Sequence, residues 1–144
     1  MAQARTTELP VSGSEDTGKL LLRVGLGVLI LLHGIAKIMS GPGFILGLME
    51  KSGLPPVLGY AVYIGEVLAP LLLIVGVYTR AAAVVVAINM IVAVVLVHMG
   101  DLGMLGKSGG WALELQGMFF LAAVVVALIG AGRYSLGGIN GRWN

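Results

Sequence analysis

The sequence predicts an all-α, polytopic membrane protein: a four-transmembrane-helix bundle with a short interfacial helix between the first and second spans. Of the 144 residues, 58% are hydrophobic and 11% are charged, whereas soluble domains carry about 45–50% apolar and about 25% charged residues. Mean hydropathy is +0.99 and the mass is 14.9 kDa. A soluble globule of this size could not bury that much apolar surface. A soluble enzyme, a nucleic-acid-binding domain and a disordered protein are therefore excluded.

Four apolar segments make up the predicted membrane domain, residues 19–132. They cover about 19–39, 57–77, 81–99 and 112–132, each close to the ~20 residues that cross about 30 Å of hydrocarbon. Lipid offers no hydrogen-bond partners to the backbone, so these segments are expected to be helices. No A-x-A-like cleavage site follows the first segment, which is therefore expected to be a retained span. Residues 1–18 are expected to form a flexible polar tail, and residues 133–144 a short basic tail.

The connections between the spans differ in kind. Residues 40–56 are rich in glycine and proline and enclose FILGLMEKS, whose apolar residues recur at helical spacing. This pattern predicts a short helix lying in the membrane interface. Residues 78–80 are expected to form a tight turn, and residues 100–111 a glycine-rich loop.

The distribution of Lys and Arg predicts the orientation, because cytoplasmic loops carry an excess of these residues. With the N-terminus inside, the cytoplasmic side holds Arg5, Lys19, Arg23, Arg80, Arg133 and Arg142, and the outer side holds Lys37, Lys51 and Lys107. The sequence thus predicts a multi-pass membrane protein with both termini in the cytoplasm.

Polar residues within the spans are the candidate functional residues, because a charge at the bilayer centre costs about 2.5–3.5 kcal/mol on insertion scales. They are Arg23, His33, Lys37, Glu66, Asn89, His98, Glu114 and Gln116. At ~1.5 Å per residue, Glu66 lies about 14 Å below the outer end of its span, near the midplane. His33, Lys37, His98 and Glu114 fall in the outer half of the membrane, where we expect them to converge above Glu66.

We assign candidate roles to six of these residues and to Tyr63. Glu66, His33 and Lys37 are the candidate catalytic residues, and Tyr63, His98, Glu114 and Arg23 are the candidate binding residues. Tyr63 lies one turn from Glu66, where an aromatic beside a buried carboxyl could hold a planar head group. The structural alternatives remain open: an ion pair of Glu66 that only pins helices together, and interfacial anchoring by Lys37 or Arg23.

Three further features concern packing. Asn89 is interpreted as an interhelical hydrogen-bonding residue. Pro70 is expected to kink the second span and to free the carbonyl of Glu66. Close helix approach is expected at Gly25, Gly27, Gly34, Gly65 and Gly76.

The residue types argue against most metal cofactors. The chain contains no cysteine, which excludes disulfides, Cys-ligated zinc and Cys-held iron–sulfur clusters within it. Bis-histidine haem ligation by His33 and His98 is sterically conceivable, and His98, Met99 and Met104 are soft enough for Cu(I). Two membrane histidines do not specify haem, and methionine is ordinary apolar filler, so no metal site is assigned.

The chain resembles the DoxX family of small bacterial membrane proteins over residues 20–136. The resemblance rests on Arg23, the HGIAK run at 33–37, Phe44 followed by Gly53-Leu54-Pro55, the run IGEVLAPLLLIVGVYTR at 64–80, and GAGRYSL at 130–136. It implies a four-helix protein of the bacterial cytoplasmic (inner) membrane. The family's namesakes are subunits of membrane oxidoreductases that pass electrons from sulfur compounds to quinone. Arg23, Gly34, Lys37 and Glu66 match the family's recurrent polar pattern, whereas Gly137 replaces an Asp that often follows Ser-Leu.

The functional interpretation is a quinone- or quinol-interacting subunit of a membrane redox system. The sequence assigns no cofactor, and quinone is the candidate. The chain has no self-sufficient catalytic motif, so a redox partner protein is expected, and a homo-oligomer is a further expectation. Two alternatives remain open. The first is a non-catalytic scaffold or anchor for a partner enzyme, and the second is a small transporter.

Overall fold

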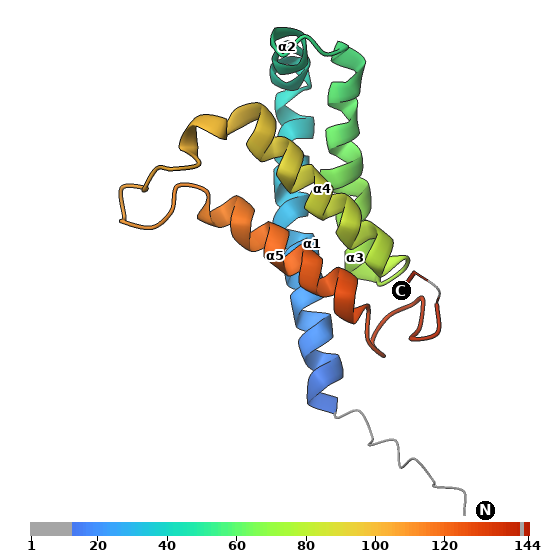
Figure 1. Cartoon of the computed structure of the whole chain (residues 1–144). Helices are drawn as coiled ribbons and strands as arrows, with labels where there is room; N and C mark the ends of the chain where they lie inside the picture. The colour runs from blue at the N-terminus through green and yellow to red at the C-terminus, as the bar shows by residue number, and fades with distance from the viewer. Residues whose placement is uncertain (1–12, 142) are drawn as a thin grey trace, which may run out of the picture.

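The computed structural model describes residues 13–141 and 143–144. The predicted tail at residues 1–12, which contains Arg5, and Arg142 near the other end lie outside the described residues. Every regular element in the described part of the chain is a helix (Figure 1). Three of these helices are long and apolar enough to cross a membrane, and a fourth apolar helix is shorter. The prediction of an all-α, polytopic membrane protein is confirmed.

The first span is longer than predicted. Helix α1 covers Gly13–Ser40, 28 residues, so residues 13–18 are helical and do not belong to a tail. The acidic side chains of Glu15 and Asp16 lie in its first turn, where negative charge is favourable near the positive end of the helix dipole. Helix α2 covers Gly43–Lys51 and occupies the position predicted for the short helix between the first two spans.

The second span, Pro56–Val75, changes its winding along its length. It begins with the 3₁₀-helix η1 (Pro56–Ala61), continues through the π-helix η2 (Ile64–Leu68) and ends with α3 (Ala69–Val75). Pro70 lies in the first turn of α3 and has no N–H to donate to the carbonyl of Glu66. The irregularity expected at Pro70 thus takes the form of a π turn, a local form that is frequent at functional sites.

The remaining helices form a second pair. Helix α4 covers Thr79–Val97, the short 3₁₀-helix η3 covers Met99–Asp101, and α5 covers Glu114–Ile129. With 16 residues, α5 is about 24 Å long, which is shorter than the segment predicted at 112–132. Figure 1 shows α4 and α5 running side by side and crossing the α1–α3 pair at an angle.

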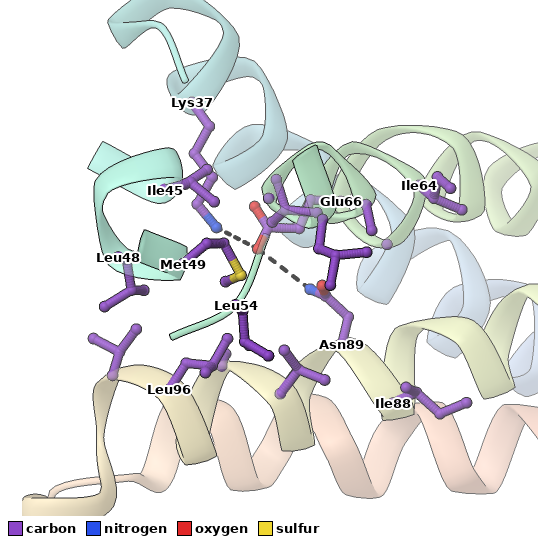
Figure 2. A pocket seen from close by; sticks show the side chains of 18 of the residues that line it. Lys37, Ile45, Leu48, Met49, Leu54, Ile64, Glu66, Ile88, Asn89 and Leu96 are labelled. Atoms are coloured by element: carbon purple, nitrogen blue, oxygen red, sulfur yellow. Dashed lines mark hydrogen bonds and ion pairs between the residues drawn. The ribbon is translucent and has the colours of Figure 1, made fainter. Parts of the chain in front are cut away.

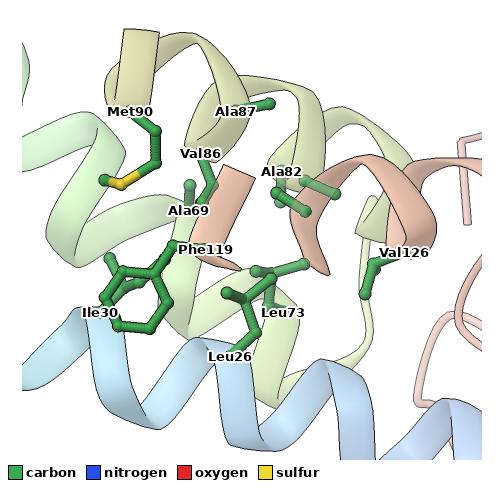
Figure 3. Packing of buried hydrophobic residues seen from close by; sticks show 12 residues of the cluster. Leu26, Ile30, Ala69, Leu73, Ala82, Val86, Ala87, Met90, Phe119 and Val126 are labelled. Atoms are coloured by element: carbon green, nitrogen blue, oxygen red, sulfur yellow. The ribbon is translucent and has the colours of Figure 1, made fainter. Parts of the chain in front are cut away.

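The core lies where these two pairs cross (Figure 3). The buried side chains come from all four long segments: Leu26, Ile30, Ala69, Leu73, Ala82, Ala83, Val86, Ala87, Met90, Phe119, Ala123 and Val126. Small residues are frequent in this set, as is usual where membrane helices pack closely. Large apolar side chains elsewhere on the helices are exposed, which suits a surface that faces lipid.

Glycines bring the helices closest together beside the π turn. A Cβ at Gly34 would overlap the backbone carbonyl of Glu66, and a Cβ at Gly65 would lie 2.6 Å from Cγ of Asn89. Gly27 approaches Pro70 and Ile74 in the same way. Gly25 faces open space, so the close approach expected there is wrong. It lies on a different side of α1 from Gly27 and Gly34.

The residues predicted as a basic tail fold against the α3–α4 turn. The Asn144 side chain is buried, and its Oδ1 accepts hydrogen bonds from the Thr79 backbone N–H at 3.2 Å and the Thr79 hydroxyl at 2.7 Å. The next N–H, that of Arg80, donates to the Trp143 carbonyl at 2.9 Å. These contacts satisfy N–H groups that the start of a helix otherwise leaves without partners.

Candidate functional site

Three polar side chains from three different membrane segments meet near the middle of the second span (Figure 2). The Lys37 ammonium of α1 donates to Oε1 of Glu66 in η2, and Nδ2 of Asn89 in α4 donates to the same oxygen at 3.3 Å. Glu66 is only 4% exposed, and its second oxygen, Oε2, is buried without a hydrogen-bond partner. A buried carboxylate with one paired and one unpaired oxygen is therefore the centre of the site.

The local sequence explains why Glu66 projects between the helices. Because Gly34 has no side chain, α1 can lie directly against the backbone of the π turn at Glu66. Gly65 makes the corresponding space for Asn89 on α4. The backbone at Glu66 is thus held between two neighbouring helices, and its side chain points to where Lys37 and Asn89 can reach it.

A cavity of about 430 Å³ adjoins this cluster, within the usual range for small-molecule sites. Its polar side chains are Lys37, Glu66 and Asn89, which Figure 2 shows gathered together, and the rest of its lining is apolar. The apolar walls come from α2, η1, η2 and α4: Phe44, Ile45, Leu48, Met49, Leu54, Leu58, Ala61, Val62, Ile64, Val85, Ile88, Val92, Ala93, Leu96 and Val97. Several of these, including Phe44, Ile64 and Ile88, are exposed, so the cavity opens towards the lipid-facing surface.

A second, smaller cavity of about 160 Å³ shares Lys37 and Glu66 with the first. Its other polar lining residues are His33, His98 and Gln116. The Lys37–Glu66 pair therefore borders two cavities of different character, one mainly apolar and one with five polar side chains.

Four of the predicted site residues meet at these cavities. His33, Lys37, Glu66 and His98 all line the second cavity, as their similar depths predicted. His33 packs edge-on against the ring of Phe119, with 5.9 Å between ring centroids, and has no hydrogen-bond partner in the described part of the chain.

Tyr63 lies apart from the carboxyl of Glu66. Its hydroxyl donates to the Lys37 carbonyl at 3.4 Å, and its ring lines a hollow with Ile38 and Val67 rather than either cavity at Glu66. Tyr63 and Glu66 were expected to lie on one face of an α-helix, because they are three residues apart. A π turn has more residues per turn, so residues three positions apart no longer lie above one another.

Arg23 and Glu114 also lie away from the cluster. Arg23 is fully buried and donates to the carbonyls of Leu73 and Ile74 at 2.6 and 2.8 Å and to that of Tyr134. Glu114 is exposed at the start of α5, where its carboxyl lies against Gly110 of the preceding loop. Neither contributes to the two cavities at Glu66.

Two residues of the site were not among the predicted site residues. Asn89 was interpreted as an interhelical hydrogen-bonding residue, and Gln116 was noted only as an intramembrane polar group. Depth is the signal that could have found Asn89. It lies nine residues into its span from Arg80, as Glu66 does from Val57, so both fall about 14 Å from a membrane surface.

No metal centre is evident within residues 13–141 and 143–144, where no group of three or more His, Cys, Asp or Glu side chains could hold an ion. Both ring nitrogens of His98 are engaged. Its Nδ1 lies 3.0 Å from Oδ2 of Asp101 and its Nε2 lies 3.3 Å from Nε2 of Gln116. An axial haem bond from His98 would therefore require one of these contacts to break.

Comparison with known proteins identifies relatives over most of the chain. The family model for DoxX matches residues 18–99, which run from the second turn of α1 to just beyond the end of α4. An uncharacterised membrane protein of Mycobacterium tuberculosis is 32% identical, with 80% of this chain and 76% of that protein aligned. CatD of Bacillus subtilis, named a "putative oxidoreductase", is 28% identical, with 82% and 83% aligned. No solved structure matches the chain.

Proposed function

This chain belongs to the DoxX family of membrane proteins, and from that premise we propose that its larger cavity binds the head group of a membrane quinone or quinol. The observation that carries the proposal is the buried carboxylate of Glu66. One of its oxygens is paired with Lys37 and Asn89, and the other has no partner. An unsatisfied buried acceptor costs about 1–3 kcal/mol, and a ligand hydroxyl could remove that cost.

The walls of the cavity indicate what kind of ligand fits. Its rim is formed by exposed apolar side chains such as Phe44 and Ile88, which would face lipid in a membrane. A ligand that enters there must be soluble in the bilayer and must carry a polar head for the far end. Quinones and quinols have this form, a ring bearing oxygen atoms on a long apolar tail.

Each polar residue then has a separate role. A quinol hydroxyl would donate to Oε2 of Glu66. The ammonium of Lys37 would stay paired with Oε1 of Glu66 and could donate to a quinone carbonyl. Asn89 would fix the orientation of the carboxyl through its hydrogen bond to Oε1.

The electrons of such a reaction require another carrier. The chain has no cysteine, and its GLG at residues 25–27 lies within a membrane helix rather than after a strand as a dinucleotide fingerprint would. We therefore propose that a redox partner protein exchanges electrons with the bound quinone. The relative named as a putative oxidoreductase supports a redox role for this chain. Assembly as a homo-oligomer would be compatible with that role.

The Lys and Arg distribution supports an orientation with both termini in the cytoplasm, in the inner membrane of a bacterium. The described basic residues of the proposed inner side gather at one end of the bundle. Arg133 pairs with Asp16, Arg80 donates to the Leu128 carbonyl, Arg23 donates to the Tyr134 carbonyl, and Lys19 lies beside Gly132. In this orientation the Glu66 cluster lies in the outer half of the membrane domain, and ligand enters from the outer leaflet.

The test is mass spectrometry of small molecules extracted from the detergent-purified protein, together with titration of a short-chain ubiquinone in nanodiscs. We expect the unmodified protein to retain quinone and Glu66→Gln to lose it. Affinity should fall by about 10- to 100-fold, because a hydrogen bond to a charged group contributes about 1.5–3 kcal/mol. Glu50→Gln is the matched control, since Glu50 is an exposed carboxyl on α2 that does not line the cavity.

Equal quinone binding by Glu66→Gln and the unmodified protein would overturn the assignment of this site. Absence of quinone from both samples, with no binding in the titration, would overturn the proposal. In that event co-purification of a partner protein would favour a scaffold, and solute flux through liposomes containing the protein would favour a transporter.

A further inference from the structure

The smaller cavity, of about 160 Å³, shares the Lys37–Glu66 pair with the apolar one. It lies among α1, η2, α4 and α5 and is lined by Ile30, His33, Lys37, Glu66, Met90, Ala93, His98, Leu115, Gln116 and Phe119. Half of these side chains are polar, which is unusual for a cavity inside a membrane domain. The role proposed for the larger cavity does not use His98 or Gln116.

Two buried acceptor atoms on its lining residues have no protein partner. One is Oε2 of Glu66 and the other is Oε1 of Gln116. Polar cavities of this kind normally hold water, and each water occupies about 30 Å³. The cavity therefore has room for several waters, and they would supply the missing hydrogen bonds to both atoms.

A row of hydrogen-bonded side chains leads from this cavity to the surface. Nε2 of Gln116 lies 3.3 Å from Nε2 of His98, and Nδ1 of His98 lies 3.0 Å from Oδ2 of Asp101. The side chains of His98 and Asp101 are 32% and 44% exposed. This row of hydrogen-bonded side chains ends at η3, where the loop between α4 and α5 begins.

The hydrogen-bond pattern allows His98 to accept a proton from the cavity side. A Gln116 amide that donates to Nε2 leaves the proton of neutral His98 on Nδ1, directed at Asp101. When Nε2 gains a proton, rotation of the Gln116 amide presents Oε1 to it, and the buried acceptor then has a partner. Both states of His98 can thus be satisfied without movement of the helices.

We propose that the smaller cavity is a water-filled proton path that connects Glu66 to the His98–Asp101 pair at the membrane surface. The inference rests on the proposed function, because it supplies the route by which protons released at a quinol head group would leave. In one transfer a proton passes from the Glu66 carboxyl to water and then to Nε2 of His98, and His98 must return to its Nδ1-protonated form before the next. The Nδ1 proton passes to Asp101, and no electron moves in these steps.

The charged and titratable groups around the path are few. Lys37 and His33 face it from α1, Glu66 from η2, and His98 with Asp101 from the end of α4 and η3. Helix α5 contributes only the neutral Gln116 to the polar lining. Lys37 stays paired with Glu66, so His98 is the group best placed to relay a proton outward.

The experiment follows protonation of Glu66 by infrared difference spectroscopy after a rapid pH jump, on the full chain in nanodiscs. The band that disappears in Glu66→Gln identifies the carboxyl. We expect Gln116→Met and His98→Phe to slow its protonation by about 100-fold, the lower range of what a positioned proton-transfer group contributes. Met118→Leu is the control, because Met118 is 63% exposed on the same helix as Gln116 and lines neither cavity.

Rates in Gln116→Met and His98→Phe equal to that of Met118→Leu would overturn the path, as would a Glu66 carboxyl that does not respond to the pH jump at all. A merely structural role of Gln116 would lower thermal stability without changing the rate, and a melting curve on each sample checks this. Quinone titration of the same samples separates the two proposals. Slowed protonation in a protein that binds no quinone would support the path and contradict the quinone site.

Discussion

Two buried charges, Arg23 and Glu66, lie near opposite ends of the contact between α1 and the second span, and their hydrogen-bond partners differ. Arg23 donates to three backbone carbonyls, those of Leu73, Ile74 and Tyr134. Glu66 has two side-chain partners on one oxygen and none on the other. Each group also leaves one buried atom without a partner, Nε of Arg23 and Oε2 of Glu66. Only Glu66 borders the cavities described above.

The difference separates a structural charge from one that is available to a ligand. Carbonyls from α3 and from the segment after α5 surround the Arg23 guanidinium, so it ties distant parts of the backbone together. The Glu66 carboxylate instead contacts the side chains of Lys37 and Asn89, and it borders two cavities. Depth in the membrane and charge alone do not distinguish these cases, whereas the type of partner and the adjacent space do.

The largest expected effect is on stability at the Arg23 end. Arg23→Met would leave three carbonyls without their donor, and each buried unsatisfied group costs about 1–3 kcal/mol. We expect the free energy of unfolding to fall by about 3 kcal/mol or more, measured by thermal unfolding in detergent. Glu66→Gln should cost less, because Lys37 is 36% exposed and can extend its ammonium towards water. A folded, stable Arg23→Met that has lost quinone would contradict the structural assignment.

The next effect tests the close approach that places Glu66. Gly34→Ala would push its Cβ into the carbonyl of Glu66, and overpacking of this kind costs about 1–3 kcal/mol. We expect both lower thermal stability and weaker quinone binding, since the displaced backbone carries the carboxyl. Gly25→Ala is the matched control on the same helix, because nothing lies within 4 Å of its new Cβ. Equal behaviour of the two variants would show that the contact does not position the site.

A smaller effect is expected where the chain end covers the start of α4. Asn144→Ala removes the side chain that accepts from the N–H and hydroxyl of Thr79. Loss of a helix-capping group costs about 1 kcal/mol, so the melting temperature should fall by a few degrees while quinone affinity stays the same. A changed affinity would mean that the two ends of the bundle are coupled.

The smallest effect is expected at Asn89. Its hydrogen bond to Oε1 of Glu66 is 3.3 Å long, and interhelical hydrogen bonds in membrane proteins average about 0.6 kcal/mol. We therefore expect Asn89→Ala to weaken quinone binding by about threefold, measured by titration in nanodiscs. Ile91→Ala is the control, because Ile91 is exposed and lines neither cavity at Glu66. A loss as large as that of Glu66→Gln would assign Asn89 direct contact with the ligand.

The predicted bounds were most accurate where hydropathy changes sharply. The third predicted span, 81–99, corresponds to α4 at Thr79–Val97, and the short helix between the first two spans is α2. The predicted bounds were less accurate at the first and last spans. Helix α1 begins at Gly13, with acidic residues in its first turn, and α5 covers only Glu114–Ile129. Polar residues can continue a helix beyond the apolar stretch, which hydropathy alone does not detect.

The sequence by itself determined the class of protein, the approximate spans and the position of each polar side chain along its span. These properties depend on local composition and on the fixed rise of a helix, both of which can be read along the chain. Depth predicted the meeting of His33, Lys37, Glu66 and His98, but it wrongly placed Glu114 with them.

Only the tertiary structure decided which side chains face one another. The π turn separates Tyr63 from the Glu66 carboxyl, Asn89 joins Glu66 from a neighbouring helix, and Arg23 meets the carbonyl of Tyr134, 111 residues away. The physical reason is that the rotation of a helix about its axis is set by packing against its neighbours. Small changes such as a glycine contact or a π turn alter that rotation without changing hydropathy.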